Sequence, residues 1–387
     1  MKISEIATPA YVIDEQKLLD NLKILSNVAD KSGAKILIAQ KAFSAYHTYP
    51  LVAEYLQGAT ASGLYEAKLA YEEMIKPFDG KKKPENHVFE PAFKDEEFPA
   101  VCEVADHVVF NSVAQLEHHR KVWEDAAARK TLSVGLRINP EFSTQEGHEI
   151  YDPCAPGSRL GIRKKDLPNP LPKGVEGLHF HTLCEQGFEP LKATFDEVEK
   201  NFGEYFKDIK WINLGGGHHI TKPDYDRDGL IVLVKYIRDK YGIDVYLEPG
   251  EAVALDAGYL VTTVMDIVET DKYPVLILDT SAACHMPDVL EMPYRPPLKD
   301  SGLCDEKKYT YRLSSRTCLA GDVIGDYSFD NEIKVGDRLT FEDMAIYSMV
   351  KNNTFNGMPL PDIDIMRKDG EVEVLKHFGY EDFKCRL

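Results

Sequence analysis

The chain has 387 residues, a formal net charge of −18 at pH 7, 43% hydrophobic residues and a mean hydropathy of −0.33. This acidic balance repels phosphate backbones and argues against general binding of nucleic acids. The sequence contains no run of about 18 apolar residues, and residues 1–6 lack an apolar signal core, so neither a membrane span nor secretion is expected. The length predicts one large barrel with an appendage, or two domains.

Cysteine and histidine usage argues against a metal or disulfide framework. Seven cysteines are present, an odd number, without a Cys-x-x-Cys pair, which predicts free thiols in a reducing cytoplasm. The histidine pairs His118-His119 and His218-His219 lack the i, i+4 spacing of a helical metal site. We therefore expect a cytoplasmic protein without a metal.

Eight short β-rich runs alternate with segments that carry apolar residues at helical spacing. The runs are residues 35–40, 59–62, 87–90, 107–110, 132–139, 177–183, 211–214 and 244–247. The helical spacing is clearest in residues 191–205 and 230–241. Strands and helices in this alternation predict an α/β fold, a parallel (β/α)8 barrel of the TIM type, over residues 17–255.

Beyond about residue 256 the helical spacing stops. Turn residues then separate β-rich runs at residues 261–268, 274–278, 309–312, 338–341 and 372–374. Residues 10–14 form a further predicted strand that comes too early to be one of the eight. We therefore predict an antiparallel β domain, a barrel or sandwich, made of residues 1–16 and 256–387.

The catalytic groups of such a barrel gather at the C-terminal ends of its strands. The residues at the predicted ends are Lys41, Ser62, Glu90, Asn111, Asn139, His181, Gly215-Gly216-Gly217 and Glu248. A partly desolvated lysine at a strand end has a lowered pKa and can attack an aldehyde as a free amine. Taken alone, Lys41 has a second interpretation, an ammonium group that extends to solvent.

Three other strand ends suit one cofactor. The glycine triplet can bring backbone N–H groups close to a phosphate, or form a flexible turn. His181, on the same strand face as His179, can stack on a flat ring, or lie in the core bonded to backbone. Glu248 can keep a pyridinium nitrogen protonated, or lie solvated in a turn. Together with Lys41, these groups favour pyridoxal 5'-phosphate as the cofactor.

Four segments are similar to those of the fold-type III pyridoxal-phosphate decarboxylases, the family of ornithine, diaminopimelate and biosynthetic arginine decarboxylases. They are the Lys41 region, His179-Phe180-His181-Thr182-Leu183-Cys184-Glu185, Glu248-Pro249-Gly250-Glu251-Ala252 and Arg316-Thr317-Cys318-Leu319-Ala320-Gly321-Asp322. The resemblance covers residues 8–357 and implies an alanine-racemase-like fold of a barrel and a β domain. It also implies that Lys41 holds the cofactor covalently, that the glycine triplet and Tyr347 bind its phosphate, and that His181 and Glu248 contact its ring.

The resemblance extends to the substrate side of the site. Cys318 resembles the cysteine that a partner subunit inserts to protonate the product, which implies a homodimer, and Asp322 resembles the acid that binds the far amino group. Cys184 stands where relatives have a serine, and Glu251 where most have an arginine. A glutamate suits a cationic amine rather than a second carboxylate. We therefore expect a carboxylated polyamine, carboxynorspermidine or carboxyspermidine, as the substrate.

Three alternatives stay open at this stage. Decarboxylation of diaminopimelate, ornithine or arginine would use the same cofactor groups. An amino-acid racemase is a second alternative, which Glu248 opposes because racemases of this type resemble enzymes with an arginine at the ring nitrogen. A non-catalytic cofactor carrier or regulator is the third, and it would lack the β domain or have lost Lys41 or Cys318.

Overall fold

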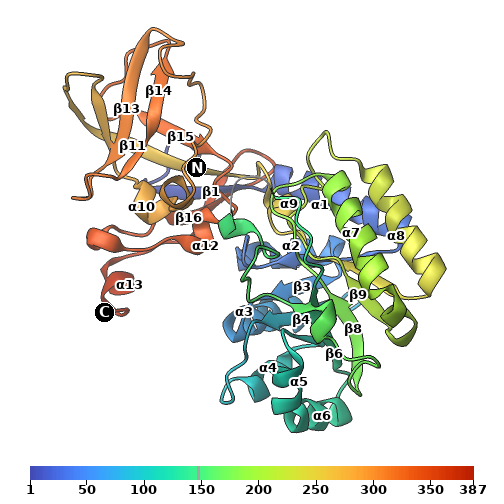
Figure 1. Cartoon of the computed structure of the whole chain (residues 1–387). Helices are drawn as coiled ribbons and strands as arrows, with labels where there is room; N and C mark the ends of the chain where they lie inside the picture. Colours follow the sequence, from blue (N-terminus) through green and yellow to red (C-terminus); the bar gives the residue numbers. More distant parts are fainter. Residues whose placement is uncertain (146–148) are drawn as a thin grey trace. The chain divides into compact units, whose positions relative to one another are not determined.

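The computed structural model describes residues 1–145 and 149–387, and these form two compact units (Figure 1). One unit contains Asn21–Val253 and the other contains Met1–Asp20 with Ala254–Leu387. The predicted boundaries, 17–255 against 1–16 with 256–387, differ from this division by four residues at one end and two at the other. Among the described residues, no helix is long and apolar enough to cross a membrane.

The larger unit is a closed barrel of eight parallel strands. They are β2 (Lys35–Ala39), β3 (Gly58–Ala61), β4 (Glu85–Glu90), β5 (His107–Phe110), β6 (Ser133–Asn139), β8 (Val175–His179), β9 (Trp211–Asn213) and β10 (Asp244–Leu247). Pairing of β10 with β2 and of β5 with β6 closes the ring. The predicted barrel is therefore confirmed.

Helices follow the strands of the barrel. They are α1 (Glu15–Ser32), which begins in the smaller unit, α2 (Tyr49–Tyr55), α3 (Leu64–Ala70), α4 (Phe98–Val104), α5 (Val113–His118), α6 (Arg120–Arg129), α7 (Phe188–Phe202), α8 (Arg227–Tyr241) and the short α9 (Glu251–Ala254). Local chemistry sets the ends of α8: the Asp226 side chain accepts from the Gly229 N–H at the start, and Gly242 adopts φ +69° at the end.

The prediction for one strand was too long. We predicted a strand over residues 177–183, but β8 ends at His179. The reason is the neighbouring strand: the end of β6 pairs with the two-residue strand β7 (Ile162–Arg163) instead of continuing along β8. His181 therefore lies in the loop after β8 and not on the strand face that it was predicted to share with His179.

A large side chain fills the barrel interior. Trp211 is buried, and its indole N–H donates to Ser133 Oγ at 2.8 Å. A Cβ atom at Gly177 or at Gly135 would overlap the indole ring. Glycine on two neighbouring strands is thus what allows the barrel to enclose a tryptophan.

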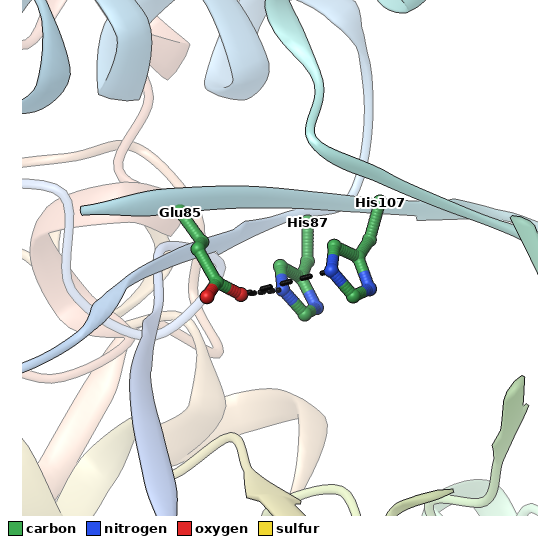
Figure 2. Close-up of side chains that lie close together, drawn as sticks. All are labelled: Glu85, His87 and His107. Carbon is green, nitrogen blue, oxygen red and sulfur yellow. Dashed lines mark hydrogen bonds and ion pairs between the residues drawn. The ribbon is translucent and has the colours of Figure 1, made fainter. Parts of the chain in front are cut away.

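A polar cluster lies near the N-terminal ends of β4 and β5, away from the strand ends where the predicted catalytic residues lie (Figure 2). His87 Nε2 lies 3.1 Å from Glu85 Oε2, and the rings of His87 and His107 stack in parallel with centroids 3.9 Å apart. Lys35 Nζ and the Tyr246 hydroxyl donate to the two oxygens of Glu85 at 3.2 and 2.7 Å. Burial, together with the neighbouring His87, lowers the pKa of His107 to about 2.

We expect this cluster to make the fold sensitive to acid. The unfolded chain takes up a proton at His107 below about pH 6.5, whereas the folded chain keeps the ring neutral. Stability therefore falls as the pH falls below that value, by up to about 1.4 kcal/mol per pH unit. His107→Asn removes this contribution, so the difference in melting temperature between wild type and variant should shrink from pH 7 to pH 5. A difference that does not change with pH would contradict the assignment.

The smaller unit is built on one sheet. Its strands are β1 (Ala10–Asp14), β11 (Gly258–Val268), β12 (Val275–Leu278), β13 (Tyr309–Ser315), β14 (Val323–Phe329), β15 (Arg338–Glu342), β16 (Asp362–Met366) and β17 (Val372–Lys376). Short helices join them: α10 (Ala282–His285), α11 (Asp288–Glu291), α12 (Ser348–Lys351) and α13 (Tyr380–Lys384). The sheet order is β14-β13-β12-β11-β1-β16-β17, with β15 beside β11. The predicted placement of residues 10–14 in this unit is confirmed.

The prediction of a purely antiparallel domain was wrong. The β1–β16 and β12–β13 pairs are parallel, so the sheet is mixed. Both parallel pairs join strands with long connections, which is the condition for parallel neighbours. Strands β14 and β16 were not predicted, because Gly325-Asp326 and the alternating Asp362 and Asp364 have the composition of turns.

Candidate active site

The predicted lysine lies just beyond the C-terminal end of β2, beside a histidine. The distance from Lys41 Nζ to His181 Nε2 is 3.2 Å. The backbone N–H of Gly216 donates to His181 Nδ1 at 2.9 Å, and Arg137 donates to the His181 carbonyl at 2.9 Å. The barrel therefore brings together residues from the ends of β2, β8 and β9, as the strand-end argument predicted.

This hydrogen-bond chain fixes the protonation of the two side chains. His181 Nδ1 accepts from a backbone N–H and carries no proton, so the neutral ring holds its proton on Nε2. Burial, with the charges of Lys41 and Arg137, lowers the pKa of His181 well below its usual value and keeps the ring neutral. The Nε2–H group then faces Lys41 Nζ and can donate only to an uncharged amine, which is the nucleophilic form.

The environment of Lys41 acts in the same direction. Its side chain reaches solvent at the strand ends of the barrel. Desolvation lowers the pKa of the Lys41 ammonium, and the nearby charge of Arg137 lowers it further. A lysine with these two neighbouring influences is suited to attack a carbonyl group.

The predicted carboxylate is largely buried, with 13% of the side chain exposed, and it is ionised. Glu248 follows β10, and its oxygens contact Asn213 Nδ2 at 2.7 Å and His179 Nε2 at 3.2 Å. Burial by itself would raise the pKa of Glu248, but His179 and Asn213 together with His87 lower it to about 2. The carboxylate is thus a fixed negative charge at neutral pH.

The glycine triplet forms a tight turn after β9. Gly215 and Gly217 have φ of +72° and +81°, which favours glycine, and a Cβ atom on Gly216 would overlap the carbonyl oxygen of Glu248. Asn213 Oδ1 accepts from the N–H of Gly215 at 2.9 Å. The turn therefore packs bare backbone against the backbone of Glu248, and a side chain would overlap it.

Sequence reasoning missed two residues of this site. Asn213 holds both Glu248 and the glycine turn. Arg137, buried on β6, lies over the ring of Phe89 at 4.6 Å and supports His181. Arg137 carried a usable signal, a charge inside the apolar run of a strand. The pairing of Glu248 with His179 and Asn213 crosses three strands, and no local pattern predicts it.

The residue that departs from the family pattern also has a partner within the barrel. Glu251, in the first turn of α9, pairs with His219 Nε2, and both side chains are largely buried. The predicted contact between Glu251 and substrate stays a prediction. Cys184, whose position relative to a phosphate was an open question, lies in the loop after β8.

The smaller unit holds the other predicted site residues. Cys318 is exposed, and its backbone N–H donates to Asn356 Oδ1 at 2.7 Å. Asp322 is buried and accepts hydrogen bonds from the hydroxyls of Ser281, Ser315 and Thr317, each at 2.6 Å. This arrangement supports a role of Asp322 in holding the loop that carries Cys318, while its predicted contact with substrate stays a prediction.

Tyr347 precedes α12 with φ +55° and ψ −40°. A tyrosine in this region costs about 1–3 kcal/mol, and residues held in such conformations cluster at functional sites. The contact of Tyr347 with a phosphate stays a prediction.

The residues of the barrel fit pyridoxal 5'-phosphate. An uncharged lysine matches the aldehyde, an ionised carboxylate matches the ring nitrogen, and a glycine turn without room for side chains matches a phosphate. A (β/α)8 barrel with these groups at its strand ends, joined to a β domain, defines the class of pyridoxal-dependent barrel enzymes.

The chain belongs to the pyridoxal-dependent decarboxylase family. The sequence model described as "Pyridoxal-dependent decarboxylase, C-terminal sheet domain" matches residues 10–345. The chain is 43% identical to a carboxynorspermidine/carboxyspermidine decarboxylase of Campylobacter jejuni over the whole of both chains. It is 40% identical to a carboxyaminopropylagmatine decarboxylase of Synechocystis sp., covering 100% of this chain and 97% of the other.

Solved structures agree with this assignment. Carboxynorspermidine decarboxylase of Campylobacter jejuni, complexed with norspermidine, superposes with a TM-score of 0.89 at 41% identity over 99% of this chain and 100% of the other. A diaminopimelate decarboxylase of Helicobacter pylori has the same fold, with a TM-score of 0.81 at 17% identity over 99% and 97% of the two chains. The chain is thus a pyridoxal-dependent decarboxylase, as the resemblance implied.

Proposed function

We propose that this decarboxylase removes the carboxyl group of carboxynorspermidine or carboxyspermidine and forms norspermidine or spermidine in polyamine biosynthesis. Relatives at 43% and 35% identity over 99% or more of this chain carry this activity in their names, and the similar structure at 41% identity binds norspermidine. The relative at 40% identity acts on a carboxylated agmatine derivative. All these named substrates join an amino-acid end to a cationic tail.

The observation that carries the proposal is an acidic pocket of about 270 Å³ at the C-terminal ends of β3 and β4, where the charge of Lys41 acts on Glu66. Glu66, Glu90 and Glu97 line it together with Ser62 and Tyr65. Within the described residues, the Glu90 side chain has neither a hydrogen-bond nor an ion-pair partner. Its partial burial and the negative charge of Glu97 raise its pKa to about 7. Ammonium groups of a polyamine would supply the positive charge that this pocket lacks.

Each barrel residue then has a role toward the cofactor. The cofactor, when bound, supplies the electron sink for loss of carbon dioxide. Lys41 would hold it covalently through its amine, Glu248 would keep the ring nitrogen protonated, and His181 would lie against the ring. The turn Gly215–Gly217 would bind its phosphate.

A polar substitution in the acidic pocket should weaken substrate binding selectively. Glu90→Gln keeps the shape of the side chain and removes its charge. We expect KM for the carboxylated polyamine to rise about 10–100-fold with kcat nearly unchanged, because a charge-assisted contact is worth about 1.5–3 kcal/mol. Glu96→Gln is the matched control, since Glu96 is an exposed glutamate on the same loop that does not line the pocket. Equal effects of both substitutions would contradict a specific role for Glu90.

The activity itself is tested by carbon dioxide release from the cofactor-loaded protein. Carboxynorspermidine, carboxyspermidine, carboxyaminopropylagmatine, meso-diaminopimelate, ornithine and arginine are compared at equal concentration. Turnover confined to the two carboxylated polyamines supports the proposal. Preferred turnover of carboxyaminopropylagmatine would show that the chain shares the substrate of the Synechocystis relative. Turnover of diaminopimelate or ornithine would contradict a polyamine substrate. Racemisation without carbon dioxide release would favour the racemase alternative.

We further propose a homodimer in which Cys318 of one subunit serves the barrel of the other. Its support is the exposed position of Cys318 on a loop that Asp322 holds in place. Mixing inactive Lys41→Ala and Cys318→Ala proteins should restore about one quarter of the wild-type activity, because half of the random dimers would carry one complete site. No recovery after subunit exchange would contradict a shared site. A cytoplasmic location is proposed from the cysteine usage, an odd number of thiols without a Cys-x-x-Cys pair.

A further inference from the structure

Two clusters in the described part of the barrel unit each bring two histidines and a carboxylate within 4.8 Å of one another. One is the cluster of Glu85, His87 and His107 (Figure 2). Its two rings are stacked, 9° from parallel with centroids 3.9 Å apart. A metal ion must lie close to the plane of each imidazole that binds it, and one ion cannot lie in two stacked planes. Lys35 and Tyr246 also occupy the oxygens of Glu85. This cluster does not chelate a metal as it is built.

The second cluster has the opposite geometry. It consists of Asp95, in the loop after β4, His118 at the end of α5, and His119 between α5 and α6. Asp95 Oδ1 lies 2.7 Å from His118 Nε2 and 3.9 Å from His119 Nδ1. Four-coordinate ligands at about 2.0–2.1 Å from a zinc ion lie about 3.3 Å apart, a value between these two separations. The two rings stand at 82° to each other, so one point can lie in both ring planes.

A backbone contact fixes the orientation of His119. Its Nε2 lies 3.3 Å from the carbonyl oxygen of Phe93, which can only accept, so Nε2 carries the proton. In the neutral ring the lone pair of Nδ1 is then free, 3.9 Å from the carboxylate oxygen of Asp95, which is beyond hydrogen-bond reach. Among the described residues, no hydrogen bond to His119 Nδ1 is formed.

A cation between the three atoms satisfies all of them. Metal-binding histidines characteristically donate their other N–H to a carbonyl or carboxylate, which is the arrangement of His119 and Phe93. We infer that Asp95, His118 and His119 form a binding site for a divalent transition-metal ion, with zinc as the best-matched ion. His119 is buried, whereas His118 and Asp95 are 55% and 66% exposed, so water can complete the coordination.

The site is distinct from the strand ends that carry Lys41 and Glu248, and it does not depend on the proposed substrate. It links the loop after β4 to the junction of α5 and α6. Because the ion would bind the folded chain in preference to the unfolded one, we expect metal binding to stabilise this side of the barrel. The sequence did not predict it, because the third ligand lies 23 residues from the histidine pair and only the fold brings it there.

The test is a titration of the chelator-treated, cofactor-loaded protein with Zn²⁺, and separately with Ni²⁺, by calorimetry and by the shift in melting temperature. Ni²⁺ is included because exposed thiols give a Zn²⁺ background, whereas imidazole is a good ligand for both ions. We expect about one equivalent to bind wild type, and affinity to fall at least about tenfold in His118→Ala, Asp95→Asn and His119→Gln. The first two alter exposed side chains, and glutamine at 119 can still donate to Phe93.

His377→Ala is the matched control. His377 is an exposed histidine paired with Asp362 at 2.9 Å in the smaller unit, and within the described residues no third ligand joins this pair. We expect this variant to bind metal as wild type does. Equal affinity in wild type and His118→Ala, or an equal loss in His377→Ala, would overturn the site and assign the binding to scattered histidine–carboxylate pairs. Absence of binding by wild type would overturn it as well.

Discussion

Lys41→Ala is expected to reduce decarboxylation by at least about 10³-fold, the largest effect of any single substitution in the barrel. The variant loses the amine that His181 holds in its uncharged form, 3.2 Å from Nε2. The other cation that acts on this position, Arg137, cannot replace it, because a guanidinium does not lose its proton at neutral pH. Activity with excess cofactor, and mass spectrometry after borohydride reduction, measure the two consequences. Wild type should retain the cofactor covalently on Lys41, and the variant should not.

Lys35→Ala is the matched control for this experiment. Lys35 lies on the same strand at its other end, where it contacts Glu85 at 3.2 Å and Asp244 at 3.1 Å. Its loss should lower the melting temperature while the cofactor remains attached at Lys41 and turnover continues. Retention of activity and of covalent cofactor by the Lys41 variant would contradict the assignment of the nucleophile. An equal loss of covalent cofactor in both variants would point to damage of the barrel instead.

Glu248→Gln should lower kcat by about 10²–10³-fold, the magnitude typical for removal of one preorganised electrostatic contact. Glutamine keeps the size of the side chain and can still accept from Asn213, but it carries no charge. The wild-type carboxylate, with a pKa of about 2, stays ionised at pH 6 and at pH 8, so a change of pH within this range does not remove its charge. We therefore expect the loss in the variant to be the same at pH 6 and pH 8.

The comparison with Glu251→Gln separates the effect of a charge near the cofactor ring from the effect of a charge near the substrate. Glu251 lies three residues further on and pairs with His219. If it acts on a cationic substrate, its substitution should raise KM more than it lowers kcat, the reverse of the result for Glu248. A kcat within about threefold of wild type in Glu248→Gln would show that this carboxylate does not control the electron sink.

The two predictions rest on one physical arrangement. The barrel places an amine that desolvation and Arg137 keep uncharged near a carboxylate that His179 and Asn213 keep charged. An uncharged amine and a charged carboxylate at neighbouring strand ends require separate environments, because desolvation lowers the pKa of the amine but would raise that of a carboxylate without hydrogen-bond partners. Strands from different parts of the chain supply those environments.

The sequence by itself determined the barrel. Each barrel strand is buried and therefore apolar, and apolar runs that alternate with segments of helical spacing form a pattern that can be read locally. It also determined which residues end the strands, so Lys41 and Glu248 could be assigned before any contact was known. Strand ends follow from local composition, and in a closed parallel barrel all of them meet at one side. Lengths were less well determined: β8 ends at His179 because β6 pairs with β7 beyond that point, which is a property of its neighbour.

Only the tertiary structure decided which groups touch. The pairing of Glu248 with His179 and Asn213, the support of His181 by Arg137 and the approach of Asp95 to the histidine pair all join residues separated by 23 or more positions. The direction of pairing in the mixed sheet was likewise fixed by long connections and not by strand composition. Such contacts depend on strand register and loop path, which the free energy of the whole fold sets, and no short segment encodes them.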